Sequence, residues 1–145
     1  MKALTSAAVV VALTLVPSFP ARAELFSKAY EFKKNTVLQV GTMLEHGLRL
    51  DSIEFIVAGD DGSPSGLFDT PKVKIAISNI GAKSVKVAIS LAVTDEANRL
   101  VGVASGGTKL FPLRADRQMT YSLDFDGANS QLATGTAFRI TIEAK

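Results

Sequence analysis

Cysteine and tryptophan are absent from the 145-residue sequence, and histidine occurs once. Without cysteine the chain cannot form a disulfide, a thiolate nucleophile or a cysteine-ligated metal site. An excess of charge is also absent, because Lys2 and Arg22 alone account for the surplus of 16 basic over 14 acidic residues. A chain without a charged block lacks the electrostatic footprint for nucleic acid or for an anionic membrane surface. The sequence therefore predicts neither of these partners.

The first 23 residues have the three parts of a secretory signal peptide. A basic start at Lys2 precedes an uncharged apolar run over 3–16, and a short stretch ends in Ala21-Arg22-Ala23. This pattern predicts a signal peptide over 1–23 that is cleaved before Glu24. As a helix the apolar run would rise about 21 Å, less than the roughly 30 Å hydrocarbon core. We therefore expect an exported chain, periplasmic or secreted, with no stable membrane span after cleavage.

Alternation of apolar and polar residues dominates the rest of the sequence. Val73, Ile75 and Ile77 alternate with more polar positions, and the run over 85–94 repeats the pattern. Such alternation predicts strands with one buried face. Further strands are expected near 100–104, 110–113, 120–125 and 138–142, spaced by about ten residues. The predicted core consists of Ile75, Val87, Ile89, Leu91, Leu123, Phe125 and Ile140.

Two apolar segments upstream, 37–44 and 48–57, predict a hairpin whose turn is Glu45-His46-Gly47. The apolar row shifts phase after Leu50, so a β-bulge is expected at Asp51-Ser52. A second turn is expected over 79–84, with Gly81 free to take a positive φ.

The strand pattern also suggests a domain organisation. Residues 24–34 fit both helical and strand spacing, so we describe 24–47 as an N-terminal extension and first strand. The domain proper is then expected over 48–145. With no convincing helix between the strands, the sequence predicts an all-β fold: an antiparallel, immunoglobulin-like sandwich of about seven to eight strands.

One segment also suggests a family. Leu91-Ala92-Val93-Thr94-Asp95 is followed by Asn98 and Gly102, so an apolar strand ends in Asp and turns back through Asn or Gly. With its flanks, from Lys72 to about Phe125, this stretch resembles bacterial FxLYD-type domains and related immunoglobulin-like or fibronectin-III-like sandwiches. Leu and Thr stand where that family has Phe and Tyr. The resemblance implies an extracytoplasmic module without a known catalytic site, so it assigns no functional residue.

Few residues could support catalysis. His46 is the only imidazole and falls in the predicted hairpin turn. The segment Gly62-Ser63-Pro64-Ser65-Gly66 approximates a nucleophile elbow but has Pro where the pattern needs Ser. The carboxylates fall mostly in loops or outward rows, and the least clearly placed are Asp51 and Glu54 beside the expected bulge. Burial is therefore not expected to raise a carboxyl pKa. The sequence predicts no enzyme, no catalytic residue and no cofactor.

A group of acidic loops is the best candidate for a metal site. If strands beginning near 48, 72, 85, 100, 108, 118 and 137 run up and down in order, one end of the sandwich collects the loops 58–70, 95–99 and 114–117. Extracellular modules bind calcium weakly through oxygen ligands on such loops. The candidate ligands are Asp60, Asp61, Asp69, Asp95 and Asp116. Alternatively, these side chains are acidic only because loops contact water.

Two classes of function are favoured, and a third, a hydrolase, is left open only because Asp and Glu pairs can act as acid and base when the fold brings them together. The first is a non-catalytic exported β-sandwich for protein interaction, or for an accessory role in the cell envelope or secretome, with another envelope or secreted protein as partner. The alternative is a weak calcium- or ligand-binding module that uses the Asp-rich loops. An uncovered strand edge or exposed apolar patch would favour the first class, and three converging carboxylates would favour the second.

Overall fold

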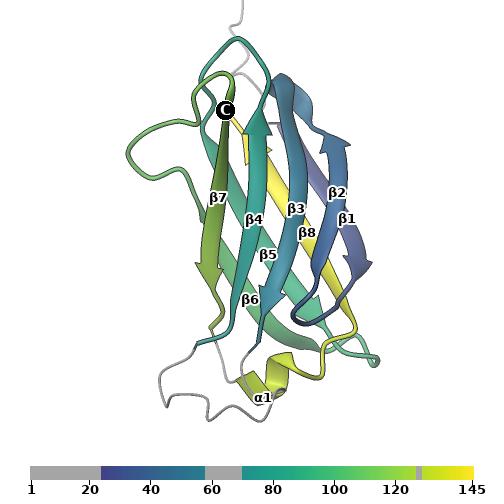
Figure 1. Cartoon of the computed structure of the whole chain (residues 1–145). Coiled ribbons are helices and arrows are strands. Elements are labelled where there is room, and N and C mark those ends of the chain that lie inside the picture. The colour runs from purple at the N-terminus through teal and green to yellow at the C-terminus, as the bar shows by residue number, and fades with distance from the viewer. Residues whose placement is uncertain (1–23, 58–69, 127–128) are drawn as a thin grey trace, which may run out of the picture.

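Two antiparallel four-stranded sheets pack face to face (Figure 1). The computed structural model describes residues 24–57, 70–126 and 129–145, so the predicted signal peptide over 1–23 lies outside the described residues. One sheet has the strand order β1-β8-β5-β6 and the other β2-β3-β4-β7. The strands are β1 (Glu24–Glu31), β2 (Val37–Met43), β3 (Leu48–Ile56), β4 (Lys72–Asn79), β5 (Val87–Thr94), β6 (Leu100–Gly107), β7 (Arg117–Asp124) and β8 (Ala137–Ala144). The predicted antiparallel β-sandwich is confirmed.

The alternating apolar rows fill the space between the sheets. In β5, for example, Val87, Ile89 and Leu91 are buried while the residues between them are more exposed. Aromatic rings continue this core towards one end, where Phe55 lies 4.6 Å from Phe32 and 4.8 Å from Phe138 between ring centroids. All seven predicted core residues are buried: Ile75, Val87, Ile89, Leu91, Leu123, Phe125 and Ile140.

The predicted hairpin at 37–57 is also confirmed. The 3-10 turn η1 (Glu45–Gly47) joins β2 and β3, and His46 takes a left-handed φ of 56° there. The β3–β4 register shifts between Leu50 and Ser52, which is the predicted bulge. This shift explains why apolar residues on both sides of the bulge reach the core, since a one-residue slip reverses the face of every later side chain.

Gly81 is needed for a different reason from the one predicted. It does not take a positive φ; the described glycines that do are Gly41, Gly47 and Gly107. A Cβ atom on Gly81 would instead lie 2.8 Å from the carbonyl oxygen of His46. The segment 80–86 therefore packs directly on the η1 turn, and a side chain at this position would force them apart.

Two segments differ from the sequence-based expectation. The N-terminal extension is part of the sandwich, since β1 pairs with β8 over its whole length from Glu24 to Glu31. Residues 110–113 form no strand; only Leu113 is bridged, to Val85, and the preceding Pro112 cannot donate a backbone hydrogen bond. One long connection over 108–116 therefore joins β6 to β7.

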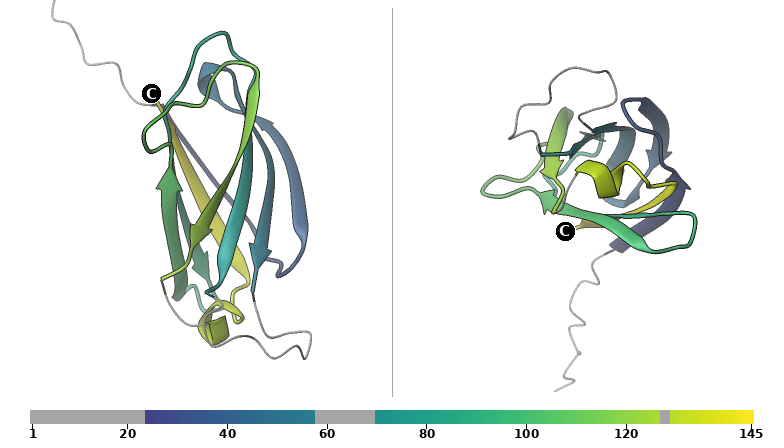
Figure 2. Two further views of the ribbon diagram at one scale, coloured as in Figure 1. Left: turned by 60° about the vertical axis from the view of Figure 1, so that its left-hand side comes forward. Right: turned by 90° about the horizontal axis from the view of Figure 1, so that it is seen from below.

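The two ends of the sandwich carry different connections (Figures 1 and 2). The α1 end contains the loop 95–99 and the short helix α1 (Asn129–Leu132), which lies across the strand ends with Leu132 buried. The His46 end contains the η1 turn and the connections 80–86 and 108–116.

Candidate functional site

The proposed acidic loops do not all meet at one end. Asp60, Asp61 and Asp69 lie outside the described residues. Asp95 follows β5 at the α1 end, whereas Asp116 precedes β7 at the opposite, His46 end. The prediction placed Asp95 and Asp116 together because it counted a strand over 108–113; without that strand, the direction of every later loop reverses.

Asp95 stabilises the turn between β5 and β6. Its Oδ1 accepts the backbone N–H groups of Ala97 and Arg99, both at 2.9 Å, and its Oδ2 accepts the Arg99 Nε–H at 2.8 Å. These hydrogen bonds from Arg99 and Ala97 hold the pKa of Asp95 below its ordinary value. Both carboxylate oxygens are therefore engaged within the turn. No group of three or more His, Asp or Glu side chains within 24–57, 70–126 and 129–145 could hold a metal ion.

Asp51 lies in a hydrogen-bonded network on the outer face of the second sheet. It accepts hydrogen bonds from Ser78 Oγ at 2.6 Å and from Gln118 Nε2 at 2.9 Å, and it forms an ion pair with Arg49. Burial alone would raise the pKa of Asp51, but these three partners outweigh it and lower the pKa. A carboxyl held ionised by its neighbours is poorly suited to act as a general acid. The network instead joins β3, β4 and β7 across the bulge.

The sandwich is closed along one side and open along the other. On the closed side, the backbone N–H of Asp126, after β7, donates to the Val103 carbonyl of β6 at 3.2 Å, and a Cβ atom on Gly106 would collide with Leu123. On the other side, β1 and β2 are the edge strands of the two sheets (Figure 1). Two clefts open between the sheets there. We call this opening the β1–β2 seam.

The two clefts of the β1–β2 seam are mostly apolar. The upper cleft, towards the His46 end, has a volume of about 230 Å³ and is lined by Leu25, Phe26, Met43, Leu44, Glu45, Ile142 and Ala144. The lower cleft has a volume of about 400 Å³. Its lining consists of the apolar or aromatic residues Tyr30, Val37, Leu38, Phe55 and Phe138 and the polar or charged residues Glu31, Lys33, Thr36 and Gln39. Leu25 is 66% exposed and Met43 is 54% exposed at the mouth of the upper cleft. These are large apolar side chains left in contact with water.

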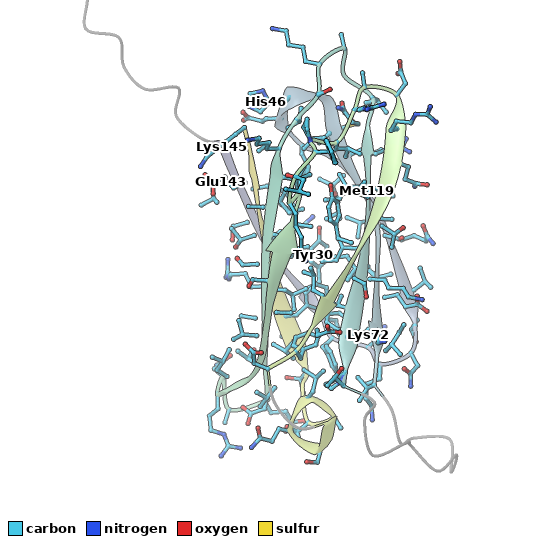
Figure 3. The ribbon with its side chains drawn as sticks, turned by 90° about the vertical axis from the view of Figure 1, so that its left-hand side faces the viewer. Tyr30, His46, Lys72, Met119, Glu143 and Lys145 are labelled. Carbon is cyan, nitrogen blue, oxygen red and sulfur yellow. The ribbon has the colours of Figure 1, made fainter. Side chains whose placement is uncertain are left out.

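Two polar features lie within the seam. The Tyr30 hydroxyl, about midway along the sandwich in Figure 3, is buried and has no hydrogen-bond partner among the described residues. Lys28 is paired with the inward residue Ile140 and so occupies the inward row of β1, where its Nζ lies 5.2 Å from the centre of the Tyr30 ring. Lys28 itself is exposed and lines neither cleft, so it brings a positive charge beside the Tyr30 ring at the edge of the lower cleft.

One signal for the seam is present in the sequence, although the strand assignment above missed it. Phe26, Lys28, Tyr30 and Phe32 share one strand face, and a lysine within an apolar row is typical of an edge strand. The seam itself could not be derived, because it depends on β1 and β2 being the edges of different sheets. Comparison with known proteins adds no assignment: the sequence matches no protein-family model and no curated protein. None of the described helices is long and apolar enough to cross a membrane.

Proposed function

We propose that this protein is a non-catalytic, exported β-sandwich module that binds an extended segment of another envelope or secreted protein in the β1–β2 seam. The observation that carries the proposal is the seam itself: an apolar opening between two edge strands, with Leu25 and Met43 exposed at its mouth. An uncovered strand edge and exposed apolar side chains are features of protein interaction sites.

The backbone of β1 supports binding by strand addition. β1 pairs with β8 on one side, and no described strand pairs with its other side. An extended segment that adds to this edge would gain main-chain hydrogen bonds and would direct alternate side chains into the clefts. The binding energy would then come from the backbone and the specificity from the clefts.

The register of β1 specifies the partner's side chains. Phe26 lines the upper cleft and Tyr30 the lower one, and four residues of strand span about 13 Å. A matching segment therefore carries two apolar side chains four positions apart. Lys28 lies between them and favours an acidic side chain at the central position. A polar group of the partner would also satisfy the buried Tyr30 hydroxyl.

A synthetic peptide tests this proposal directly. In the probe, two leucines four positions apart flank a central glutamate, and threonine fills the other positions; a second peptide has lysine at the centre. We expect fluorescence anisotropy to show saturable binding of the glutamate peptide to the chain beginning at Glu24, and markedly weaker binding of the lysine peptide.

Two exposed leucines on opposite edges of the same sheet provide a matched pair of variants. Leu25 in β1 is 66% exposed and Leu100 in β6 is 62% exposed. Leu25→Gln should weaken peptide binding about tenfold through lost apolar contact, whereas Leu100→Gln should leave it unchanged. Equal binding of both peptides, or equal effects of both substitutions, would refute the seam as the binding site.

Export and the lack of catalysis are parts of the same proposal. Mass spectrometry of the natively produced protein should find a chain that begins at Glu24, and an intact Met1 form would contradict export by a cleaved signal peptide. The lowered pKa values of Asp51 and Asp95 support the non-catalytic assignment, because general acids need raised ones. Hydrolytic turnover lost on substitution of either residue, with unchanged stability, would contradict it.

A further inference from the structure

The most exposed apolar side chains of the described structure lie at the tip of the connection between β6 and β7. Leu110 is 85% exposed and Phe111 is 74% exposed, and they are adjacent in the sequence. Burying an apolar side chain stabilises a protein, so two adjacent exposed ones forgo that free energy. Such a pair indicates a surface that becomes covered by something else.

The tip is held away from the sandwich by hydrogen bonds at both of its ends. The backbone N–H of Thr108 donates to the carbonyl of Val87 at 2.8 Å, and Val85 and Leu113 exchange backbone hydrogen bonds at 2.8 and 2.9 Å. The side chain of Leu113 is buried at the base. Residues 109–112 therefore form an anchored protrusion, which we call the Leu110–Phe111 tip, and it need not become ordered when it binds.

Basic residues are numerous at the end of the sandwich that carries the Leu110–Phe111 tip. The connections that meet at the His46 end carry Lys83, Lys86, Lys109, Arg114 and Arg117, all exposed and none in an ion pair with a described residue. The acidic side chains at this end are fewer. The described acidic side chains there are Glu45, Asp116 and Glu143, the last paired with Lys145 at 2.8 Å (Figure 3), and Glu24 begins β1 at the same end.

We propose that the His46 end docks on an anionic lipid bilayer, with Leu110 and Phe111 inserted into the interfacial layer and the surrounding lysines and arginines on the headgroups. A protruding apolar pair with a basic rim matches the two contributions to peripheral membrane binding, apolar burial and attraction to anionic lipid.

The fold creates this surface from residues that are scattered in the sequence. The mature chain is close to neutral, which argued against an anionic membrane surface as a partner. Folding brings the connections 80–86 and 108–116 to one end, and their charges are then separated from the acidic residues elsewhere. Attraction to a charged surface depends on the local charge within about one Debye length, roughly 8 to 10 Å, rather than on the total.

The absence of tryptophan allows a direct test of insertion. Phe111→Trp in the chain beginning at Glu24 introduces a single fluorophore at the tip. Both sheets and the described core lie within this form. With vesicles of equal parts phosphatidylglycerol and phosphatidylcholine, we expect a blue shift of its emission and co-sedimentation of the protein. Leu100→Trp, at the α1 end, is the matched control and should show no shift.

Substitutions and salt separate the two contributions to binding. Replacing Leu110 and Phe111 by serine should weaken vesicle binding at least about tenfold, and each lysine or arginine replaced by glutamine about fivefold. Raising the salt concentration should weaken binding further. Pure phosphatidylcholine vesicles should bind little. Equal binding to both vesicle types would overturn the proposal.

The same experiment identifies other occupants of the tip. Poly-glutamate represents an acidic protein surface. If it shifts the Phe111→Trp emission as vesicles should, while vesicles do not, the tip binds protein and the membrane proposal is wrong. Vesicle binding that is unchanged by the serine substitutions would show that charge alone acts, which also refutes insertion.

Discussion

Removing the Asp51 carboxylate should destabilise the sandwich, because this group joins three strands of one sheet. Asp51 on β3 accepts hydrogen bonds from Ser78 on β4 and Gln118 on β7 and pairs with Arg49. Hydrogen bonds to a charged group contribute about 1.5 to 3 kcal/mol each. Gln118 is exposed and Arg49 is 44% exposed, so their contributions are reduced by solvent. We expect Asp51→Ala to lower the free energy of unfolding by about 2 kcal/mol, measured by urea denaturation at pH 7.

The pH dependence of the stability of Asp51→Ala tests whether the ionised carboxylate is the cause of the loss. The pKa of Asp51 is lowered in the folded protein from its ordinary value of 3.8. Its contribution is therefore complete above that pH and is lost as the pH falls through the folded pKa. The difference between wild type and Asp51→Ala should shrink at acidic pH. Asp124, whose exposed side chain on β7 forms no hydrogen bond with a described residue, is the control, and Asp124→Ala should change the free energy of unfolding by no more than about 0.5 kcal/mol. Equal losses for Asp51→Ala and Asp124→Ala would refute the network's role.

Three further predictions concern the core, an edge strand and a turn. Ile89→Ala should lower the free energy of unfolding by about 2 to 5 kcal/mol in urea denaturation, whereas Lys86→Ala should change it by no more than about 0.5 kcal/mol. Similar values for the two variants would mean that the buried and exposed faces of the strand are misassigned. Lys28→Thr removes the inward charge of edge strand β1 and should promote self-association, measured by sedimentation velocity. An unchanged sedimentation profile would show that Lys28 does not prevent pairing at this edge. Asp95→Asn should lower the melting temperature at neutral pH by weakening the Arg99 contacts, whereas Glu96→Gln should not.

The strands were predictable because each has one buried face. Val73, Ile75 and Ile77 alternate in the sequence as they do in the sheet, and the phase shift after Leu50 marked a real bulge. Local alternation depends only on the strand itself and its immediate surroundings. The pairing of strands depends on distant parts of the chain. For example, β4 and β5 are consecutive in the sequence but belong to different sheets.

The candidate sites were less predictable, because they depend on topology. One misassigned strand over 108–113 reversed the expected end of Asp116, and the same error hid the protruding Leu110–Phe111 tip as an apolar strand. An apolar dipeptide next to a proline is compatible with either assignment. Asp95, predicted as a metal ligand, instead serves the local turn, since Asp side chains readily accept neighbouring backbone N–H groups.

The two proposed surfaces share one geometry. β1 begins at the His46 end and runs towards the α1 end, so the β1–β2 seam begins at the end that we place on the bilayer (Figure 1). From Glu24 to Tyr30 the strand covers about 20 Å, which is more than a Debye length of roughly 8 to 10 Å. The basic rim therefore has little electrostatic influence on the lower cleft, where the charges are those of Glu31 and Lys33 in its lining and of Lys28 beside the Tyr30 ring. A partner strand that leaves the same membrane would enter the seam at the upper cleft, beside Leu25 and Met43, and would run away from the lipid along β1.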